Sequence, residues 1–161
     1  MRTFVLQTRS GREQDVARQL RHLRFEAFVP TKTELLRSGG KWYERTVLIF
    51  SHYVFVRFEP NPENWHRIRL ADGFVKFLGD GRPVPISESE EAYVRWLWND
   101  GKPLGVSKVF VTAEGDKLVL SGPLRKYQDG QIEYRLRQQR AVLWITLGGK
   151  KRKLTLPCVS V

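Results

Sequence analysis

The residues of this sequence whose chemistry is easiest to read are basic side chains placed where a polyanion could reach them. Four follow directly on a Gly-Gly dipeptide that is typical of a tight turn: Lys150, Lys151, Arg152 and Lys153. Three more lie just upstream: Arg135, Arg137 and Arg140. Lys and Arg side chains hold phosphate oxygens through charge-assisted hydrogen bonds. This C-terminal set predicts a surface for RNA phosphates.

A second basic set lies on and before a predicted N-terminal helix. It comprises Arg9, Arg12, Arg18, Arg21 and Arg24. Its regular spacing could line the edge of a nucleic-acid groove, but a solvated helix face explains the same spacing nearly as well.

Aromatic residues interleave with the C-terminal charges, namely Tyr127, Tyr134 and Trp144. Aromatic rings beside cations can stack the bases of single-stranded nucleic acid. Packing inside a small β-structure is the preferred interpretation of all three, and of Trp144 in particular.

Catalytic chemistry has little support in this sequence. The three histidines, His22, His52 and His66, lack metal-ligand spacing, and no nucleophile elbow or phosphate loop is present. The single cysteine, Cys158, excludes an internal disulfide and is expected to be a small buried hydrophobe. We therefore expect a non-enzymatic protein without a metal or cofactor.

The overall charge supports a phosphate-rich partner. The formal net charge is +11 and 41% of residues are hydrophobic, so the chain should fold and attract polyanions. Residues 1–98 carry 16 Lys+Arg against 12 Asp+Glu, whereas residues 113–161 carry 10 against 4. No apolar stretch approaches the roughly 18 residues of a membrane span, and a cytoplasmic location without membrane contact is expected.

The N-terminal elements predict an antiparallel sheet covered by helices. Strands are expected at 4–8, 25–36, 42–50, 52–58 and 75–78, and the strand at 52–58 should be central because both of its faces are apolar. Three helices should begin at capping signals: a Ser10/Glu13 box before 11–24, Asn61-Pro62, and a Ser87/Glu90 box. The fold class is therefore α+β.

The C-terminal elements are short strands separated by Gly-rich turns. After a linker at 99–112, in which 108–112 could form an extra strand, strands are expected at 117–120, 131–136, 141–147 and 154–159. This spacing predicts a five-stranded, SH3-like barrel.

Several motifs then identify a family. The segments 50–56 (FSHYVFV), 65–69 (WHRIR) and 83–87 (PVPIS) resemble successive motifs of the NGN domain of NusG-like proteins. Gly115-Asp116, Gly122-Pro123 and Gly130 resemble the KOW motif. The resemblance implies an NGN domain at 1–98, a linker at 99–112 and a KOW domain at 113–161. The hairpin around Gly39-Gly40 and the compact length look like a specialised antitermination paralogue of the LoaP type.

The resemblance implies a monomeric bacterial transcription elongation and antitermination factor that acts in the cytoplasm at the nucleoid. Its NGN domain would bind the clamp helices of the RNA polymerase largest subunit, suppress pausing, and reach the second large subunit from the second helix. Its basic surfaces would contact nascent RNA. The implied polymerase-binding residues are an exposed, largely aromatic patch and two polar residues of the second helix: Phe4, Phe28, Val29, Pro30, Phe50, Tyr53 and Phe55, with His66 and Arg67.

Two alternatives stay open. One is a general NusG factor that couples to Rho or the ribosome, although the turn Leu147-Gly148-Gly149-Lys150 lacks the bulky apolar tip that relatives use. The other is a ribosome-associated KOW protein that binds RNA without polymerase.

Overall fold

The N-terminal half is built on a four-stranded antiparallel sheet with the order β2-β5-β1-β6. The computed structural model describes residues 1–79, 82–127 and 130–161. The strands are β1 (Arg2–Thr8), β2 (Glu26–Phe28), β5 (Tyr53–Phe58) and β6 (Phe74–Phe77). The predicted central position of the 52–58 strand is confirmed, because β5 pairs with β2 on one side and β1 on the other.

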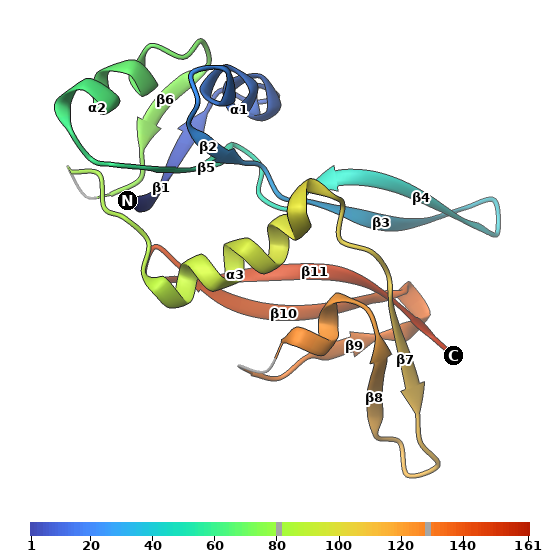
Figure 1. The fold of residues 1–161 in the computed structure, drawn as a ribbon. Helices are drawn as coiled ribbons and strands as arrows, with labels where there is room; N and C mark the ends of the chain where they lie inside the picture. Colours follow the sequence, from blue (N-terminus) through green and yellow to red (C-terminus); the bar gives the residue numbers. More distant parts are fainter. Residues whose placement is uncertain (80–81, 128–129) are drawn as a thin grey trace.

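The alternation along β5 divides the interior into two cores, as its two apolar faces predicted. Val54, Val56 and Phe58 enter one buried cluster, whereas Phe55 enters another. Successive side chains of a strand point to opposite faces, so this sheet is covered on both sides. Figure 1 shows α1 and α2 on one face, and α3 with the C-terminal strands on the other.

Two helices cover the first face: α1 (Glu13–His22) and α2 (Pro62–Arg69). The cap of α2 is as predicted, since the Asn61 side chain accepts a hydrogen bond from the backbone N–H of Asn64. The predicted capping box of α1 is wrong. Gly11 turns the chain with a φ of 78°, the helix begins later, and the Glu13 carboxylate accepts from Gly11 N at 3.0 Å instead.

A long hairpin projects from the body (Figure 1). Its strands are β3 (Thr31–Ser38) and β4 (Lys41–Leu48), joined at Gly39-Gly40 as predicted. The expected strand at 25–36 is divided at Val29-Pro30, because proline has no N–H for a ladder. The base of the hairpin is held by Leu104, which donates to Thr31 O at 2.9 Å and accepts from Thr33 N at 2.8 Å.

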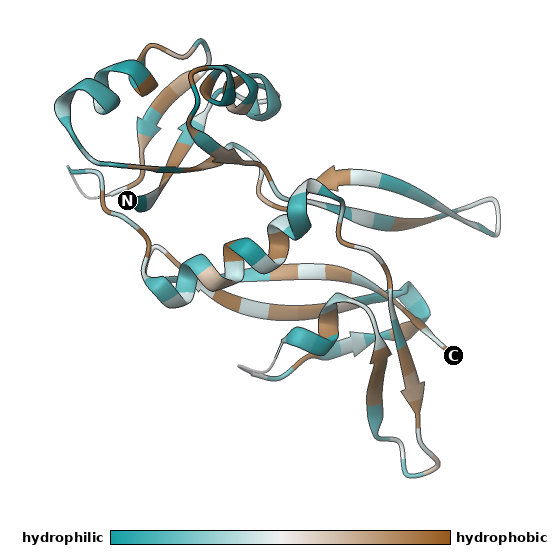
Figure 2. Ribbon diagram, in the orientation of Figure 1, coloured by the Kyte–Doolittle hydropathy of each residue, from teal (hydrophilic) through white to brown (hydrophobic). Residues whose placement is uncertain are grey.

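The third helix, α3 (Glu88–Trp98), covers the second face. Its predicted capping box is present, because Ser87 Oγ accepts from Glu90 N while the Glu90 carboxylate accepts from Ser87 N. Ile86 N donates to Thr3 O at 2.9 Å, which fixes the start of α3 to β1. Figure 2 shows hydrophilic and hydrophobic residues alternating along this helix, as suits an element with one face inward.

The C-terminal half is a five-stranded sheet with the order β8-β7-β11-β10-β9. Its strands are β7 (Ser107–Val111), β8 (Lys117–Ser121), β9 (Glu133–Arg135), β10 (Arg140–Leu147) and β11 (Lys150–Ser160), with 3-10 turns at Asn99–Gly101, Pro123–Lys126 and Leu136–Gln138. The α+β fold class is confirmed. The strand β7 lies inside the predicted linker at 99–112, because its parallel pairing with β11 brings it into the sheet.

Candidate functional site

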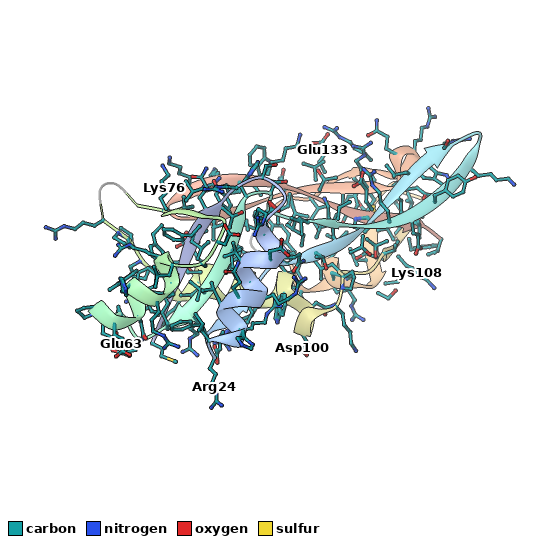
Figure 3. All side chains as sticks on the ribbon, turned by 90° about the horizontal axis from the view of Figure 1, so that it is seen from above. Arg24, Glu63, Lys76, Asp100, Lys108 and Glu133 are labelled. Atoms are coloured by element: carbon teal, nitrogen blue, oxygen red, sulfur yellow. The ribbon has the colours of Figure 1, made fainter. Side chains whose placement is uncertain are left out.

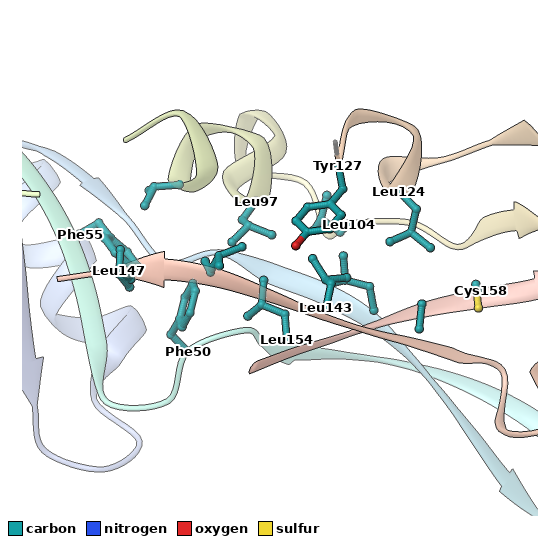
Figure 4. Close-up of a cluster of buried hydrophobic side chains, with 14 of the residues drawn as sticks. Phe50, Phe55, Leu97, Leu104, Leu124, Tyr127, Leu143, Leu147, Leu154 and Cys158 are labelled. Atoms are coloured by element: carbon teal, nitrogen blue, oxygen red, sulfur yellow. The ribbon is translucent and has the colours of Figure 1, made fainter. Parts of the chain in front are cut away.

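The aromatic residues predicted to contact polymerase are not exposed in this structure. Phe50 is 8% and Phe55 0% exposed, and both belong to the buried cluster that α3 and the C-terminal sheet complete. Figure 4 shows them beside Leu147 and Leu154 of β10 and β11, with Leu97 of α3 above. The expectation of an exposed patch is therefore wrong for this conformation, because the C-terminal half covers that face.

Polar contacts surround this covered face. The Arg152 guanidinium lies over the Tyr53 ring at 5.4 Å, and its Nη1 donates to the Tyr53 hydroxyl at 3.4 Å. Gly149 N donates to the Glu90 carboxylate at 3.2 Å, and Lys32 Nζ donates to the backbone carbonyl of Thr155. An apolar centre with a polar rim is the usual build of a protein interface.

Two of these groups are held away from water. Glu90 is 7% exposed, and its two carboxylate oxygens accept from Ser87 N and Gly149 N. Burial is the largest cause that lowers the pKa of Lys32, ahead of the opposing effect of Glu34. The capping box predicts the contact of Glu90 with Ser87, but no local pattern predicts those of Glu90 with Gly149 or of Lys32 with Thr155, because these partners are distant in the chain.

Helix α3 is held to both halves of the molecule. On the N-terminal side, Thr3 Oγ1 donates to the Glu91 carboxylate, which also lies 3.6 Å from Arg57 Nε. On the C-terminal side, Trp96 Nε1 donates to Pro123 O at 3.1 Å, and the Trp96 ring stacks on Tyr127 with centroids 6.1 Å apart. The helix therefore contacts both halves of the molecule through specific polar and aromatic interactions.

The other predicted polymerase contacts are distributed over both faces of the N-terminal sheet. Phe4 and Val29 lie in the cluster under α1 and α2, at 3% and 2% exposed, and Pro30 is also buried. Phe28 is half-buried, and its ring lies 5.3 Å from that of Trp98. The structure therefore joins Phe28, Phe50, Tyr53 and Phe55 into one aromatic face and places Phe4 and Val29 apart from it.

The two predicted polar contacts lie on α2. His66 is exposed, whereas Arg67 is half-buried with its guanidinium 4.9 Å from the Phe25 ring and its Nη2 donating to Leu23 O at 3.2 Å. Trp65 packs against Phe4 and Phe58, as a core residue would. Since α2 covers the face opposite α3, His66 and Arg67 lie apart from the aromatic face.

The basic set around α1 is partly neutralised. Arg12 Nε lies 3.1 Å from the Asp15 carboxylate and Arg12 Nη2 lies 3.0 Å from Asp72, while Arg18 contacts the other oxygen of Asp15 at 2.8 Å. Arg21 Nε donates to Ala27 O, and burial lowers its pKa. Arg9 is exposed, and Arg24 extends into solvent after the helix end (Figure 3).

The C-terminal basic set divides into two groups along β10. Arg135 and Arg140 are directly opposite each other in the β9–β10 pair, with Arg137 in the turn between the two strands. The Lys and Arg residues at 150–153 lie in β11 beyond a turn in which Gly148 and Gly149 both have positive φ, at 62° and 75°. Such a two-residue turn fixes the strand register.

That register separates the four consecutive cations. Lys151 and Lys153 are opposite Thr146 and Trp144 on the outer face, whereas Arg152 is opposite the buried Ile145 and reaches Tyr53. The single patch expected from residues 150–153 is therefore wrong, because a strand sends alternate side chains to opposite faces. Lys150 is exposed opposite Leu147, which is buried and offers no apolar tip.

The sequence interpretation of Trp144 as a core residue is wrong, since its side chain is 50% exposed. Tyr127 is buried as expected, and its hydroxyl donates to Trp144 O at 2.7 Å. Trp144, Tyr127, Tyr93 and Lys151 line a groove of about 580 Å³ between α3 and the C-terminal sheet. Its aromatic and cationic lining is the chemistry that the interleaved residues suggested.

Within the described parts of the chain, no three His, Cys, Asp or Glu side chains gather closely enough to hold a metal ion. No helix there is long and apolar enough to cross a membrane.

Comparison with known proteins identifies the family. The family model described as "Transcription termination factor nusG" matches residues 1–95. The transcription termination/antitermination protein NusG of Helicobacter pylori strain 26695 is 23% identical over 166 residues, which cover 95% of this chain and 93% of the relative. NusG of Pasteurella multocida is 35% identical over 100 residues, which cover 55% of each chain.

A solved structure has the same fold. It is a structure of Thermotoga maritima NusG, described as showing domain interaction in that protein, with a TM-score of 0.58 and 20% identity over 97% of this chain and 93% of the other. The family match covers residues 1–95 of the 161 in the sequence, and this chain belongs to the NusG family of transcription factors.

Proposed function

We propose that this protein binds the clamp helices of the RNA polymerase largest subunit through the aromatic face formed by Phe28, Phe50, Tyr53 and Phe55, and thereby suppresses pausing and termination. The proposal rests on one observation: the C-terminal sheet packs against this aromatic face. Its apolar centre and polar rim are matched by another part of the same chain, as a binding surface would be matched by a partner.

The docked C-terminal sheet and the clamp helices would compete for this face. Polymerase binding then requires the sheet to move aside, so the observed affinity is lowered by the fraction of molecules in which the face is open. Weakening the docking contacts should therefore strengthen polymerase binding.

Bound polymerase would be held with its clamp closed. A factor that binds the closed clamp more tightly than the open one shifts the equilibrium by the difference in affinity, without taking part in the chemistry. His66, exposed on α2, and the neighbouring Arg67 would contact the second large subunit across the cleft.

The remaining parts of the proposal concern organisation and recruitment. The polymerase-binding part spans residues 1–98, and the C-terminal sheet contacts nascent RNA through its basic residues between positions 135 and 153. The protein acts as a monomer in the bacterial cytoplasm, as a specialised antitermination paralogue of the LoaP type. The long β3–β4 hairpin with its Gly39-Gly40 turn is the feature that favours this subtype.

The contact between Tyr53 and Arg152 provides a two-sided test, because either Tyr53→Ala or Arg152→Ala removes it. In the full chain, Arg152→Ala should raise the affinity for a clamp-helix fragment by roughly fivefold, the equivalent of about 1 kcal/mol for one cation–π contact. Tyr53→Ala should lower it, because Tyr53 belongs to the binding face. Affinity is measured by titration without RNA.

Arg135→Ala is the matched control, since Arg135 lies on the C-terminal sheet and pairs with Glu133. It should leave the affinity unchanged. A change in the same direction for Tyr53→Ala and Arg152→Ala would remove the aromatic face from the polymerase site. Absence of binding by both the wild type and Arg152→Ala would reject the proposed function.

A further inference from the structure

The groove beside Trp144 combines an exposed aromatic ring with one lysine of its lining, Lys151, and a second lysine, Lys153, stands next to it on the same strand. Trp144 lies opposite Lys153 in the β10–β11 pair, and Thr146, two residues further along β10, lies opposite Lys151. Directly opposed residues of an antiparallel pair project from the same face. Trp144, Lys151 and Lys153 therefore share one face of the C-terminal sheet.

This face is held rigidly. The backbone on which Trp144 stands is paired with β11, and its carbonyl oxygen accepts the Tyr127 hydroxyl at 2.7 Å. Gly130 permits this arrangement, because a Cβ there would lie 2.8 Å from the Tyr127 hydroxyl. A ring on an ordered strand loses little conformational freedom when a ligand stacks on it.

The chemistry of the lining is complementary to a nucleotide. The described residues that line the groove include Tyr93, Trp144, Gln131 and Lys151, and no carboxylate is among them. An indole presents a π-face to any base, an amide offers hydrogen bonds, and ammonium groups attract phosphates. A groove of about 580 Å³ has room for one or two nucleotides.

We propose that this groove binds single-stranded RNA, with a base stacked on Trp144 and neighbouring phosphates held by Lys151 and Lys153. The proposal rests on the proposed contact with nascent RNA and specifies its place and form. Stacking on a side chain requires a base that is free of its own duplex, so the groove selects single strands over helices.

The groove differs from the basic sets read from the sequence. The ion-paired arginines of α1 do not line this groove, and neither do Arg135 and Arg140. Trp144, Lys151 and Lys153 all belong to the β10–β11 pair, and Tyr93 of α3 completes the lining from the other side.

The test measures the affinity of the full chain for a fluorescein-labelled RNA of about 12 nucleotides, as a single strand and as a duplex, by fluorescence anisotropy. Trp144→Ala should weaken single-strand binding roughly tenfold, with less than a twofold change for the duplex. Trp144→Phe, which keeps an aromatic face, should restore most of the affinity. Tyr43→Ala, at a side chain that is 53% exposed on the distant hairpin, is the matched control.

The lysines are tested through salt dependence. Replacing Lys151 and Lys153 by Gln should lower the slope of log affinity against log salt by about 1.4, or about 0.7 for each phosphate contact with a single strand. The same change at Lys108 and Lys117, two exposed lysines of β7 and β8, should leave the slope unchanged.

The possible results distinguish failure of the groove from failure of the broader proposal that the protein contacts RNA. If the wild type binds no RNA, both the RNA contact and the groove are rejected. If the wild type binds RNA but Trp144→Ala binds equally well, or loses duplex binding to the same extent, the groove alone is rejected.

Discussion

The two faces of the N-terminal sheet are covered in different ways. Under α1 and α2 the cover comes from the same half of the chain, and Phe58 is enclosed by the rings of Phe4, Phe25, Trp65 and Phe77. On the other face, much of the cover comes from the distant C-terminal sheet, with charged groups at the rim. The first face is therefore packed as a core within one half of the chain, whereas the second has the composition of an interface between the two halves, which we propose can open.

The largest effect is expected on the core under α1 and α2. Phe58→Ala should lower the free energy of unfolding by roughly 3 to 5 kcal/mol, because the side chain is 1% exposed and leaves a cavity among rings. Urea unfolding measures the change, with the surface variant Tyr43→Ala expected to stay within about 0.5 kcal/mol of wild type. A loss below about 1 kcal/mol would contradict a tightly packed core on this face.

A smaller effect is expected at the interface. Trp96→Phe removes the hydrogen bond to Pro123 O and should weaken docking by about 1 kcal/mol, or roughly fivefold. The amide of Gly149, which donates to Glu90 across the interface, should exchange its hydrogen faster by that factor.

The amide of Val56, inside the N-terminal sheet, serves as the internal reference for this exchange. Its rate should not change in Trp96→Phe. Equal acceleration of both amides would mean that the two faces open together, and the distinction between core and interface would fail.

The smallest effect concerns the C-terminal sheet alone. Burial raises the pKa of the Cys158 thiol to about 11 from an ordinary 9.0. The neutral thiol is favoured when folded, so its contribution to stability is complete below about pH 9 and is lost as the pH rises towards 11. Unfolding curves should show a smaller decline over this range for Cys158→Ala than for wild type. Identical declines would contradict a closed environment around the thiol.

Much of the N-terminal half follows from local sequence. The two faces of β5, the caps at Asn61 and Ser87, and the hairpin turn were predicted because each depends on a few neighbouring residues. The Ser10 cap was wrong because Gly11 adopts a positive φ that delays the helix, and a capping pattern does not reveal this turn.

The wrong predictions about the site residues have a common physical cause. Whether Phe55 is exposed depends on contacts with residues nearly one hundred positions away, such as Leu147, and no local period reports them. The division of Lys151 from Arg152 follows from strand alternation, but only after the start of β11 is placed at Lys150 instead of Leu154. The exposure of Trp144 depends on the same register.

The central claim is that the aromatic face acts on polymerase and that the C-terminal sheet covers it. A pause-escape assay with purified polymerase, comparing wild type, Arg152→Ala and Tyr53→Ala at equal subsaturating concentrations, tests both parts at once. The wild type should shorten the pause, Arg152→Ala should shorten it further, and Tyr53→Ala should have little effect. Equal pause lifetimes with all three proteins and without any factor would contradict the account.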